Sequence, residues 1–294
     1  MSNIVQIVND KILDQLSRGV VPWSKPWVGP RGAYSIASGR TYSLLNQMLL
    51  GLPGAYATYE QWGRLGGRVR KGEKGHFIVF WKLQENKIPD ENGEEKIEKY
   101  PVLRYYKVFH HSQIAGISFD IKRDEDILPP DPNDAAEKIL WTYVDREHLG
   151  YIEDKDSDKA YYSPQKDLVV IPAREYFSSS SKLYGVVYHE LCHSTGHRNR
   201  LNRSGFEHAA FGSKDYSFEE LVAELGSCYL LESIGISTKD AIENSASYID
   251  GWIKAFQGDE KLIIKAAPAA EKAANYILGT YDNHNIKTDN NLSL

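Results

Sequence analysis

The 294-residue chain contains little sulfur, with two cysteines and two methionines. The two cysteines, Cys192 and Cys228, are too few for a disulfide framework or a cysteine-rich zinc module. No apolar run reaches the length of about 20 residues that a membrane-spanning helix needs. The amphipathic start of the chain has neither a basic leader nor a small-residue cleavage site. We therefore expect a soluble, cytoplasmic protein with no membrane partner.

Acidic and basic residues are distributed unevenly along the chain. The net charge is −5, yet residues 1–82 contain eleven Lys and Arg against four Asp and Glu, so this part is +7 and the remainder is −12. Such asymmetry is typical of a surface for nucleic acid, or for another acidic partner, at the basic end. The basic glycine-rich turn at residues 66–75 is not a phosphate-binding loop, because Glu73 stands where that motif needs lysine.

His189, Glu190 and His193 form an HExxH motif within residues 181–196, which we predict to be helical. Positions i and i+4 share one face of a helix, so both imidazoles can bind the same Zn²⁺ ion. Zinc lowers the pKa of a bound water to near 7, and a neighbouring carboxylate can take the proton and pass it to a leaving amine. The motif therefore predicts a metallopeptidase with Glu190 as its base.

A zinc site of this kind needs a third protein ligand. The metzincin pattern would require histidine at position 199, which is Asn199, and a methionine downstream of the motif, where the chain has none. A second amphipathic helix is predicted over residues 217–225, and its Glu220 and Glu224 share a face. One of the two would be the ligand, and the other would accept the outer N–H of a ligand histidine.

His197, Glu219 and the acidic segment as a whole each allow an interpretation other than metal binding. His197 lies at the frayed end of the same predicted helix and is awkwardly placed for a ligand. Glu219 points away from the face of Glu220, and we expect it to be solvated. The alternative for the whole acidic segment is a solvated stripe without a metal.

We expect an α+β protein with an N-terminal α+β domain over residues 1–125 and a C-terminal domain over residues 134–283, which carries the HExxH helix. The boundary is predicted at residues 122–133, where charges meet Pro129, Pro130 and Pro132. Further helices are predicted up to about residue 16 and over residues 41–50, 58–65, 134–149, 246–256 and 260–278. Strands are predicted over residues 76–83 and 102–109 and within 158–171. Residues 85–98 are polar and charged, and we predict a loop across a hairpin there. A strand before the HExxH helix could offer its free edge to a peptide.

Aromatic and basic residues alternate in the N-terminal part, as in proteins that bind single-stranded nucleic acid by stacking and phosphate contacts. Since a small domain needs some of these rings in its core, we expect at least half of them to be structural. The candidate DNA-binding residues from this pattern are Trp23, Lys25, Trp27, Arg31, Arg40, Tyr42, Trp62, Arg64, Arg68, Arg70, Lys71 and Lys74.

Motifs along nearly the whole chain resemble the ArdC-type antirestriction proteins of conjugative plasmids, whose N-terminal domain is shared with TraC-type plasmid primases. In the N-terminal part they are residues 22–27, residues 38–42 followed by Asn46, and residues 58–62, 66–75 and 106–109. In the C-terminal part they are residues 161–164, 189–197, 200–203 and 219–224. The resemblance adds Asn46 to the candidate DNA-binding residues.

The resemblance implies a single-stranded-DNA-binding domain joined to a zincin-like metallopeptidase domain, in a protein that protects incoming plasmid DNA from host restriction. It implies that His189, His193 and Glu220 are the ligands, that Glu190 is the base, and that Glu224 supports a ligand histidine. The chain departs from the family pattern at His110, where asparagine is common. It departs again at Ser194, where tryptophan is common.

Two functions remain open at this point. In the first, the N-terminal domain coats single-stranded DNA, and the peptidase domain clips a protein met on that strand. In the second, the chain is a regulatory or DNA–protein-crosslink protease that DNA only recruits or activates. A structural or vestigial zinc site is a third, weaker alternative.

Overall fold

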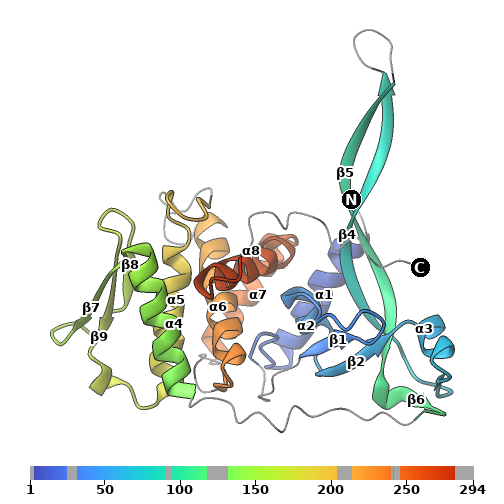
Figure 1. Cartoon of the computed structure of the whole chain (residues 1–294), viewed down its shortest axis with the longest axis horizontal. Coiled ribbons are helices and arrows are strands. Elements are labelled where there is room, and N and C mark those ends of the chain that lie inside the picture. Colours follow the sequence, from blue (N-terminus) through green and yellow to red (C-terminus); the bar gives the residue numbers. More distant parts are fainter. Residues whose placement is uncertain are drawn as a thin grey trace.

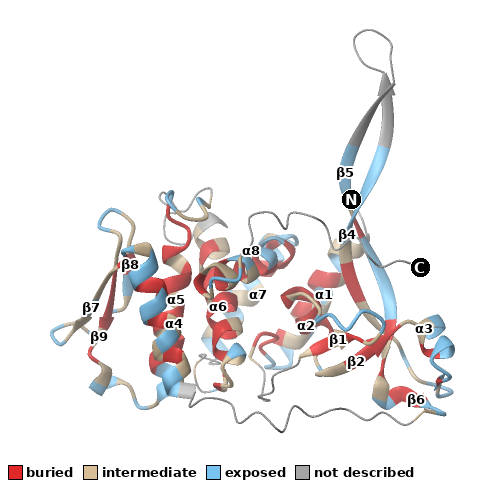
Figure 2. Ribbon diagram, viewed as in Figure 1, coloured by how far each residue is buried: buried red, intermediate tan, exposed pale blue. Residues whose placement is uncertain are grey.

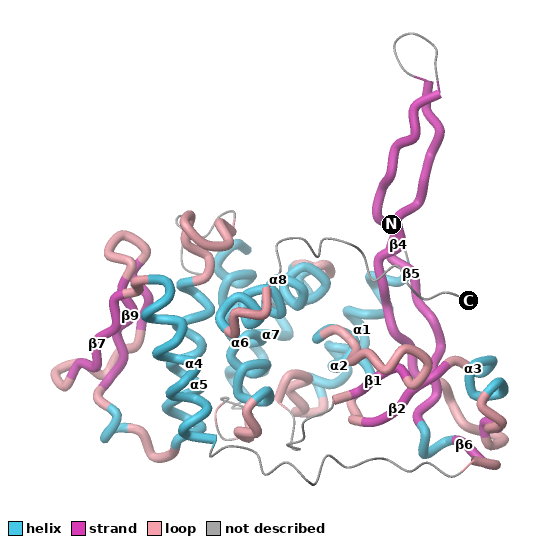
Figure 3. The backbone as a smooth tube through the Cα atoms, viewed as in Figure 1, coloured by secondary structure: helices cyan, strands magenta, loops and turns pink. Residues whose placement is uncertain are grey.

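The computed structural model describes residues 3–24, 32–89, 95–117, 132–203, 214–239, 241 and 246–281. Helices and strands are mixed throughout, as Figures 1 and 3 show. The first part comprises α1 (Asn3–Ser17), β1 (Ala33–Ser35), α2 (Leu44–Leu50), β2 (Gly54–Ala57), α3 (Tyr59–Arg64), β3 (Arg68–Val69), β4 (His76–Pro89), β5 (Glu95–His110), η1 (His111–Gln113) and β6 (Ile114–Ala115). The second comprises α4 (Pro132–Glu147), β7 (Gly150–Asp154), β8 (Tyr161–Ser163), β9 (Leu168–Pro172), η2 (Arg174–Tyr176), α5 (Ser180–Ser194), α6 (Lys214–Ser233), α7 (Ala246–Gly258) and α8 (Leu262–Ile277).

The main sheet of the first part has the strand order β1-β2-β5-β4. Strands β4 and β5 pair antiparallel from His76 opposite Val108 to Pro89 opposite Glu95, and this hairpin projects far from the body of the molecule (Figure 1). The prediction of a loop over residues 85–98 is wrong at both ends, because the strands continue to Pro89 and from Glu95. A two-stranded ribbon that projects from the body needs no alternating apolar residues, so its sequence lacks the usual strand signal.

The sheet of the second part has three strands in the order β7-β9-β8. Strand β9 pairs parallel with β7 and antiparallel with β8, so it is central. The free edges therefore belong to β7 and β8, and a peptide could not be added along β9, the strand that directly precedes α5. Helix α5 packs on this sheet through a core that includes Val169, Ile171 and Leu191.

The two parts share one hydrophobic core. Val8, Ile12 and Leu16 of α1 belong to the same buried cluster as Leu225 of α6 and Phe256 of α7. Figure 2 shows buried stretches on α6, α8, α1 and α2. Polar contacts cross the same junction. The Asn9 side chain donates to the Phe256 carbonyl (3.3 Å), and the Leu44 amide donates to the Glu271 carboxylate (3.1 Å).

The predicted domain boundary at residues 122–133 falls almost wholly on residues 118–131, which lie outside the described part of the chain. Residues 1–125 and 134–283 remain a prediction as separate domains. Within the described ranges, every helix is too short or too polar to cross a membrane.

Candidate metal centre

Helix α5 carries the HExxH motif, and local chemistry sets where this helix begins. Ser179 has extended backbone dihedrals and its hydroxyl accepts the Lys182 amide (3.3 Å), which caps the helix N-terminus. Leu183, Val187 and Leu191 recur at intervals of four residues and are buried against the sheet side. This burial fixes the rotation of α5, and it turns the histidine face towards α6.

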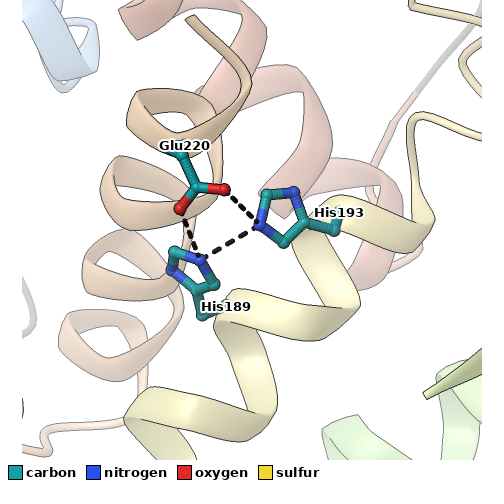
Figure 4. Close-up of side chains that lie close together, drawn as sticks. All are labelled: His189, His193 and Glu220. Atoms are coloured by element: carbon teal, nitrogen blue, oxygen red, sulfur yellow. Dashed lines mark hydrogen bonds and ion pairs between the residues drawn. The ribbon is translucent and has the colours of Figure 1, made fainter. Parts of the chain in front are cut away.

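His189, His193 and Glu220 converge on one point between α5 and α6 (Figure 4). The two Nε2 atoms are 3.1 Å apart. The two oxygens of the Glu220 carboxylate face different histidines. Oε2 lies 3.5 Å from His189 Nε2, and Oε1 lies 3.5 Å from His193 Nε2. Donor atoms bound to zinc at 2.0–2.1 Å in a tetrahedron lie about 3.3 Å from one another. The donor set and its spacing therefore fit a zinc-sized divalent ion.

The outer nitrogens of the two histidines also face carboxylates. Glu224 Oε2 lies 3.7 Å from His189 Nδ1, close enough for an ion pair but longer than a hydrogen bond. Glu219 Oε1 lies 3.5 Å from His193 Nδ1. Each imidazole thus stands between Glu220 on its inner side and a second α6 carboxylate on its outer side.

Glu219 is buried rather than solvated, so its predicted place on the surface is wrong. Its side chain is 7% exposed and forms an ion pair with Arg203, whose Nε–H donates to Oε2 at 2.9 Å. Arg203 also donates to the Thr195 hydroxyl (2.6 Å) and the Cys192 carbonyl (2.9 Å). Burial alone would raise the pKa of Glu219, but the hydrogen bonds and charges of Arg203 and His193 outweigh it and lower the pKa.

The carboxylates determine the protonation of the cluster. Burial by itself would lower the pKa of His189, but the hydrogen bond with Glu220 and the charges of Glu190, Glu224 and Glu220 raise it to about 9. Glu190 follows His189 on α5 and is 7% exposed. The site is therefore rich in negative charge and half-buried, and the negative charge favours a divalent cation.

A hydrogen-bond chain leads from the first part of the molecule to this cluster. The indole N–H of Trp23 donates to the Tyr248 hydroxyl (3.3 Å), which donates to Glu224 Oε1 (2.7 Å). The other oxygen of Glu224 faces His189. Trp23 is 1% exposed and lies edge-on to Trp252 of α7. Its predicted role as a stacking surface for DNA is wrong for this structure, because neither face of the ring is accessible.

Two other candidate DNA-binding residues are also interior. Trp62 is 0% exposed and donates its indole N–H to the Phe109 carbonyl (2.9 Å). The buried Asn46 amide pairs with both the N–H and the C=O of Val79 (2.8 Å each). These contacts use the groups that would have met a base, so the prediction of DNA contact is wrong for both residues. Tyr42 is half-buried, and burial raises its pKa to about 12.

Among the candidates that the structure describes, those at exposed positions are all cationic. Arg70 is less available for a phosphate contact, since it forms an ion pair with Glu73 at 3.0 Å. Lys25, Trp27 and Arg31 lie outside the described residues. The candidates with exposed positions are Arg40, Arg64, Arg68, Arg70, Lys71 and Lys74.

The two departures from the family pattern have structural roles. His110 bonds the Pro53 carbonyl through Nε2 (3.0 Å) and Ser112 through Nδ1 (2.7 Å). Ser194 is buried, and its hydroxyl meets that of Tyr143 at 2.9 Å. His197 is buried but is not among the three converging groups. None of these residues changes the donor set.

Comparison with known proteins assigns both parts of the chain. Residues 2–109 match the N-terminal domain of the anti-restriction factor ArdC, and residues 147–269 match a zincin-like metallopeptidase family. Two TraC DNA primases of Escherichia coli are 33% and 32% identical over 93% and 92% of this chain. The chain spans only 20% and 26% of their lengths. The uncharacterized protein y4eC of Sinorhizobium fredii is 29% identical and is covered over 92% of its length.

Solved structures agree along the whole chain. The metal-free crystal structure of the antirestriction protein ArdC from plasmid R388 superposes with a TM-score of 0.72 at 33% identity, over 95% of this chain and 98% of that one. Its Mn(II)-bound structure gives a TM-score of 0.70 at 32% identity, over 96% and 100%. The α+β class, with an ArdC-type N-terminal domain and a zincin-like C-terminal domain that implies a metal ion, is confirmed, and the chain belongs to the ArdC family of antirestriction proteins.

Proposed function

We propose that this protein binds single-stranded plasmid DNA in the cytoplasm of a recipient cell, protects it from host restriction, and carries an active zinc metallopeptidase domain. Family membership supports the antirestriction role. The observation that carries the peptidase role is the convergence of His189, His193 and Glu220, with a further carboxylate behind each histidine. The proposed protein substrate is one that is bound to the same DNA.

The side chains of the site suit peptide hydrolysis. His189, His193 and Glu220 would hold the ion, which supplies Lewis acidity and a nucleophilic water when bound. Glu190 accepts a proton from the attacking water and returns it to the amine that leaves. Glu219 and Glu224 hold the two imidazoles in orientation, which keeps their Nε2 atoms directed at one point.

The metal-binding part of this proposal is tested by comparing two histidines at the end of α5. We expect His193→Gln to lose bound zinc after purification and His197→Gln to keep it, because only His193 belongs to the converging set. Metal content measured by plasma mass spectrometry gives the result. Since ArdC of R388 is known with Mn(II), titrations with both Zn²⁺ and Mn²⁺ identify the preferred ion. Equal loss of metal in both variants would contradict the assignment.

The DNA-binding part is tested on the wild-type chain. We expect a fluorescent 20-nucleotide oligo(dT) to bind at least tenfold more tightly than a duplex of the same length, with affinity falling steeply as salt rises. The exposed cations Arg64, Arg68, Lys71 and Lys74 supply phosphate contacts in this proposal. Equal affinity for the two DNA forms would rule out a single-strand preference.

One observation favours the alternative, a protease that DNA recruits or activates. The chain Trp23–Tyr248–Glu224 connects the part proposed to bind DNA with a residue beside His189. Glu190→Ala distinguishes the two functions in a plasmid-transfer assay with a restricting host. Protection that persists in this variant supports the leading proposal. Protection that disappears while single-stranded DNA still binds supports the alternative.

A further inference from the structure

The two faces of the β4–β5 hairpin differ in chemistry. Alternation along the strands places Phe80, Lys82 and Gln84 of β4 on the same face as Arg104 and Tyr106 of β5. We call these five residues the aromatic–cationic face. The opposite face carries Trp81 and Leu83 of β4, with Tyr105 and Lys107 of β5.

Aromatic rings on the aromatic–cationic face are already arranged for stacking. The rings of Phe80 and Tyr106 lie parallel, with centroids 4.8 Å apart and planes 3° apart. Tyr106 is 44% exposed, so it retains accessible ring surface, and Tyr100 stands further out on the same face at 39% exposure. Such a pair is a platform on which another flat ring can continue the stack.

The cations beside these rings have no acid among the described side chains of the face. Lys82 and Arg104 are exposed, and Arg104 donates a hydrogen bond to the neutral Gln84 side chain (3.2 Å). Together with the rings they border a half-open surface hollow of about 390 Å³. On the opposite face, Lys99 is paired with Glu85 at 2.8 Å. Among the described side chains of the ribbon, the aromatic–cationic face therefore carries two exposed cations and no acid, whereas the opposite face carries the Lys99–Glu85 pair and one further exposed cation, Lys107.

We propose that the aromatic–cationic face of the β4–β5 hairpin is a binding surface for single-stranded DNA. A base stacks on the Tyr106–Phe80 pair, and phosphates lie against Lys82 and Arg104. Every base has a flat face, so this surface accepts any sequence, and a paired base in a duplex does not offer that face. The inference rests on the proposed DNA-binding function. It adds the β4–β5 hairpin as a second DNA-binding element, beside the cations of residues 64–74.

The test compares the two faces of the hairpin in the full-length protein. Fluorescence anisotropy with labelled 20-nucleotide oligo(dT) measures the dissociation constant for Tyr106→Ser, Lys82→Gln and Arg104→Gln. Trp81→Ser and Lys107→Gln are the matched controls, because they remove an exposed ring and an exposed charge from the opposite face. Thermal unfolding followed by circular dichroism verifies that each variant folds.

We expect Tyr106→Ser to raise the dissociation constant at least fivefold, and the two controls to change it less than twofold. Lys82→Gln should also reduce the slope of log affinity against log salt concentration by about 0.7, the value for one lost phosphate contact on a single strand. Lys107→Gln should leave the slope unchanged although it changes the net charge equally.

Three outcomes would overturn the inference, and they are distinguishable. Wild-type affinity in Tyr106→Ser, Lys82→Gln and Arg104→Gln would place the DNA elsewhere on the chain and leave the proposed function intact. Equal weakening by variants of both faces would show general attraction to the hairpin and no specific surface. A wild-type protein that fails to bind oligo(dT) would remove the proposed function together with this inference.

Discussion

Two ion pairs, one in each part of the molecule, show how differently the two parts use charge. Arg203 and Glu219 lie beside the metal-binding cluster with side chains 9% and 7% exposed. Lys99 and Glu85 lie across the β4–β5 hairpin with side chains 59% and 56% exposed. The first pair is surrounded by further hydrogen bonds, to Thr195 and Cys192. The second pair is surrounded by solvent.

Removing one partner has a much larger energetic cost in the first pair than in the second. An enclosed ion whose partner is removed remains buried and uncompensated, which destabilises the fold by several kcal/mol. An exposed pair contributes about 0–1 kcal/mol and is screened by salt. Charge near α5 and α6 therefore supports structure and the metal site, whereas charge on the hairpin is available for a partner. The following four predictions test this contrast.

The largest effect is expected for Arg203→Met. This change leaves the Glu219 carboxylate buried without its cation, and we expect a loss of about 3 kcal/mol in the free energy of unfolding. Urea denaturation followed by fluorescence measures it. The double variant Arg203→Met with Glu219→Gln is the control, and it should recover part of the loss. If Arg203→Met were as stable as the wild type, the buried ion pair would contribute no more to stability than an exposed one.

A smaller effect is expected for Tyr248→Phe, which removes the donor to Glu224. We expect the unfolding free energy to fall by about 1–2 kcal/mol and the affinity for zinc to fall several-fold, because Glu224 faces His189 and is proposed to orient it. Trp23→Phe is the comparison for zinc affinity alone, since it breaks the outer hydrogen bond of the chain and also removes buried ring volume from the core. Competition with a chromogenic chelator measures zinc affinity. If Trp23→Phe lost as much zinc affinity as Tyr248→Phe, the loss would instead reflect a general change in packing around the site.

A pH effect is expected at His110. Burial, together with the neighbouring His111, lowers the pKa of His110 to about 4, so the ring stays neutral in the folded protein while the unfolded chain takes up a proton near pH 6.5. Stability should therefore fall as the pH falls from 6.5 towards 4. Between pH 7 and pH 5, we expect the unfolding free energy of His110→Gln to fall by about 1–2 kcal/mol less than that of the wild type. Urea denaturation at the two pH values measures the difference. Parallel pH profiles for the two proteins would refute this assignment.

The smallest effect is expected for the exposed pair. Glu85→Gln should change the unfolding free energy by less than about 0.5 kcal/mol. Thermal unfolding at low and high salt measures it, and Lys99→Gln provides the reciprocal variant. A loss comparable to that of Arg203→Met would remove the contrast between the two regions.

The core of the candidate site could be predicted from sequence because helix geometry determines it. The spacing of His189 and His193, and that of Glu220 and Glu224, follows directly from 3.6 residues per turn. The same geometry predicts that Glu219 points to solvent, because adjacent helical residues such as Glu219 and Glu220 face different directions. Where α6 crosses α5, however, His193 is displaced one turn from His189, and its outer nitrogen meets Glu219. Interhelical crossing of this kind is not encoded in the periodicity of either helix.

Solvent exposure was the harder property to predict. Alternating aromatic and basic residues indicated a nucleic-acid surface, but composition does not say which rings face inwards, and Trp23 and Trp62 prove to be core residues. The expectation that many of these rings are structural agrees with that burial. The sequence predicts only an ordinary strand over residues 102–109, so it does not indicate that Tyr105 and Tyr106 are exposed. A ribbon exposed on both faces has no hydrophobic alternation to reveal it.

The core shared by α1, α2, α7 and α8 has a consequence for how this chain can be divided. Cutting between its N-terminal and C-terminal parts would expose buried residues of both fragments to water, among them Ile12, Leu16, Trp23 and Phe256. We therefore expect neither fragment to fold stably or stay soluble by itself. The same packing limits recombination between relatives. A functional exchange would have to move both parts together, as matches over 93% and 92% of this chain within the much longer TraC primases illustrate.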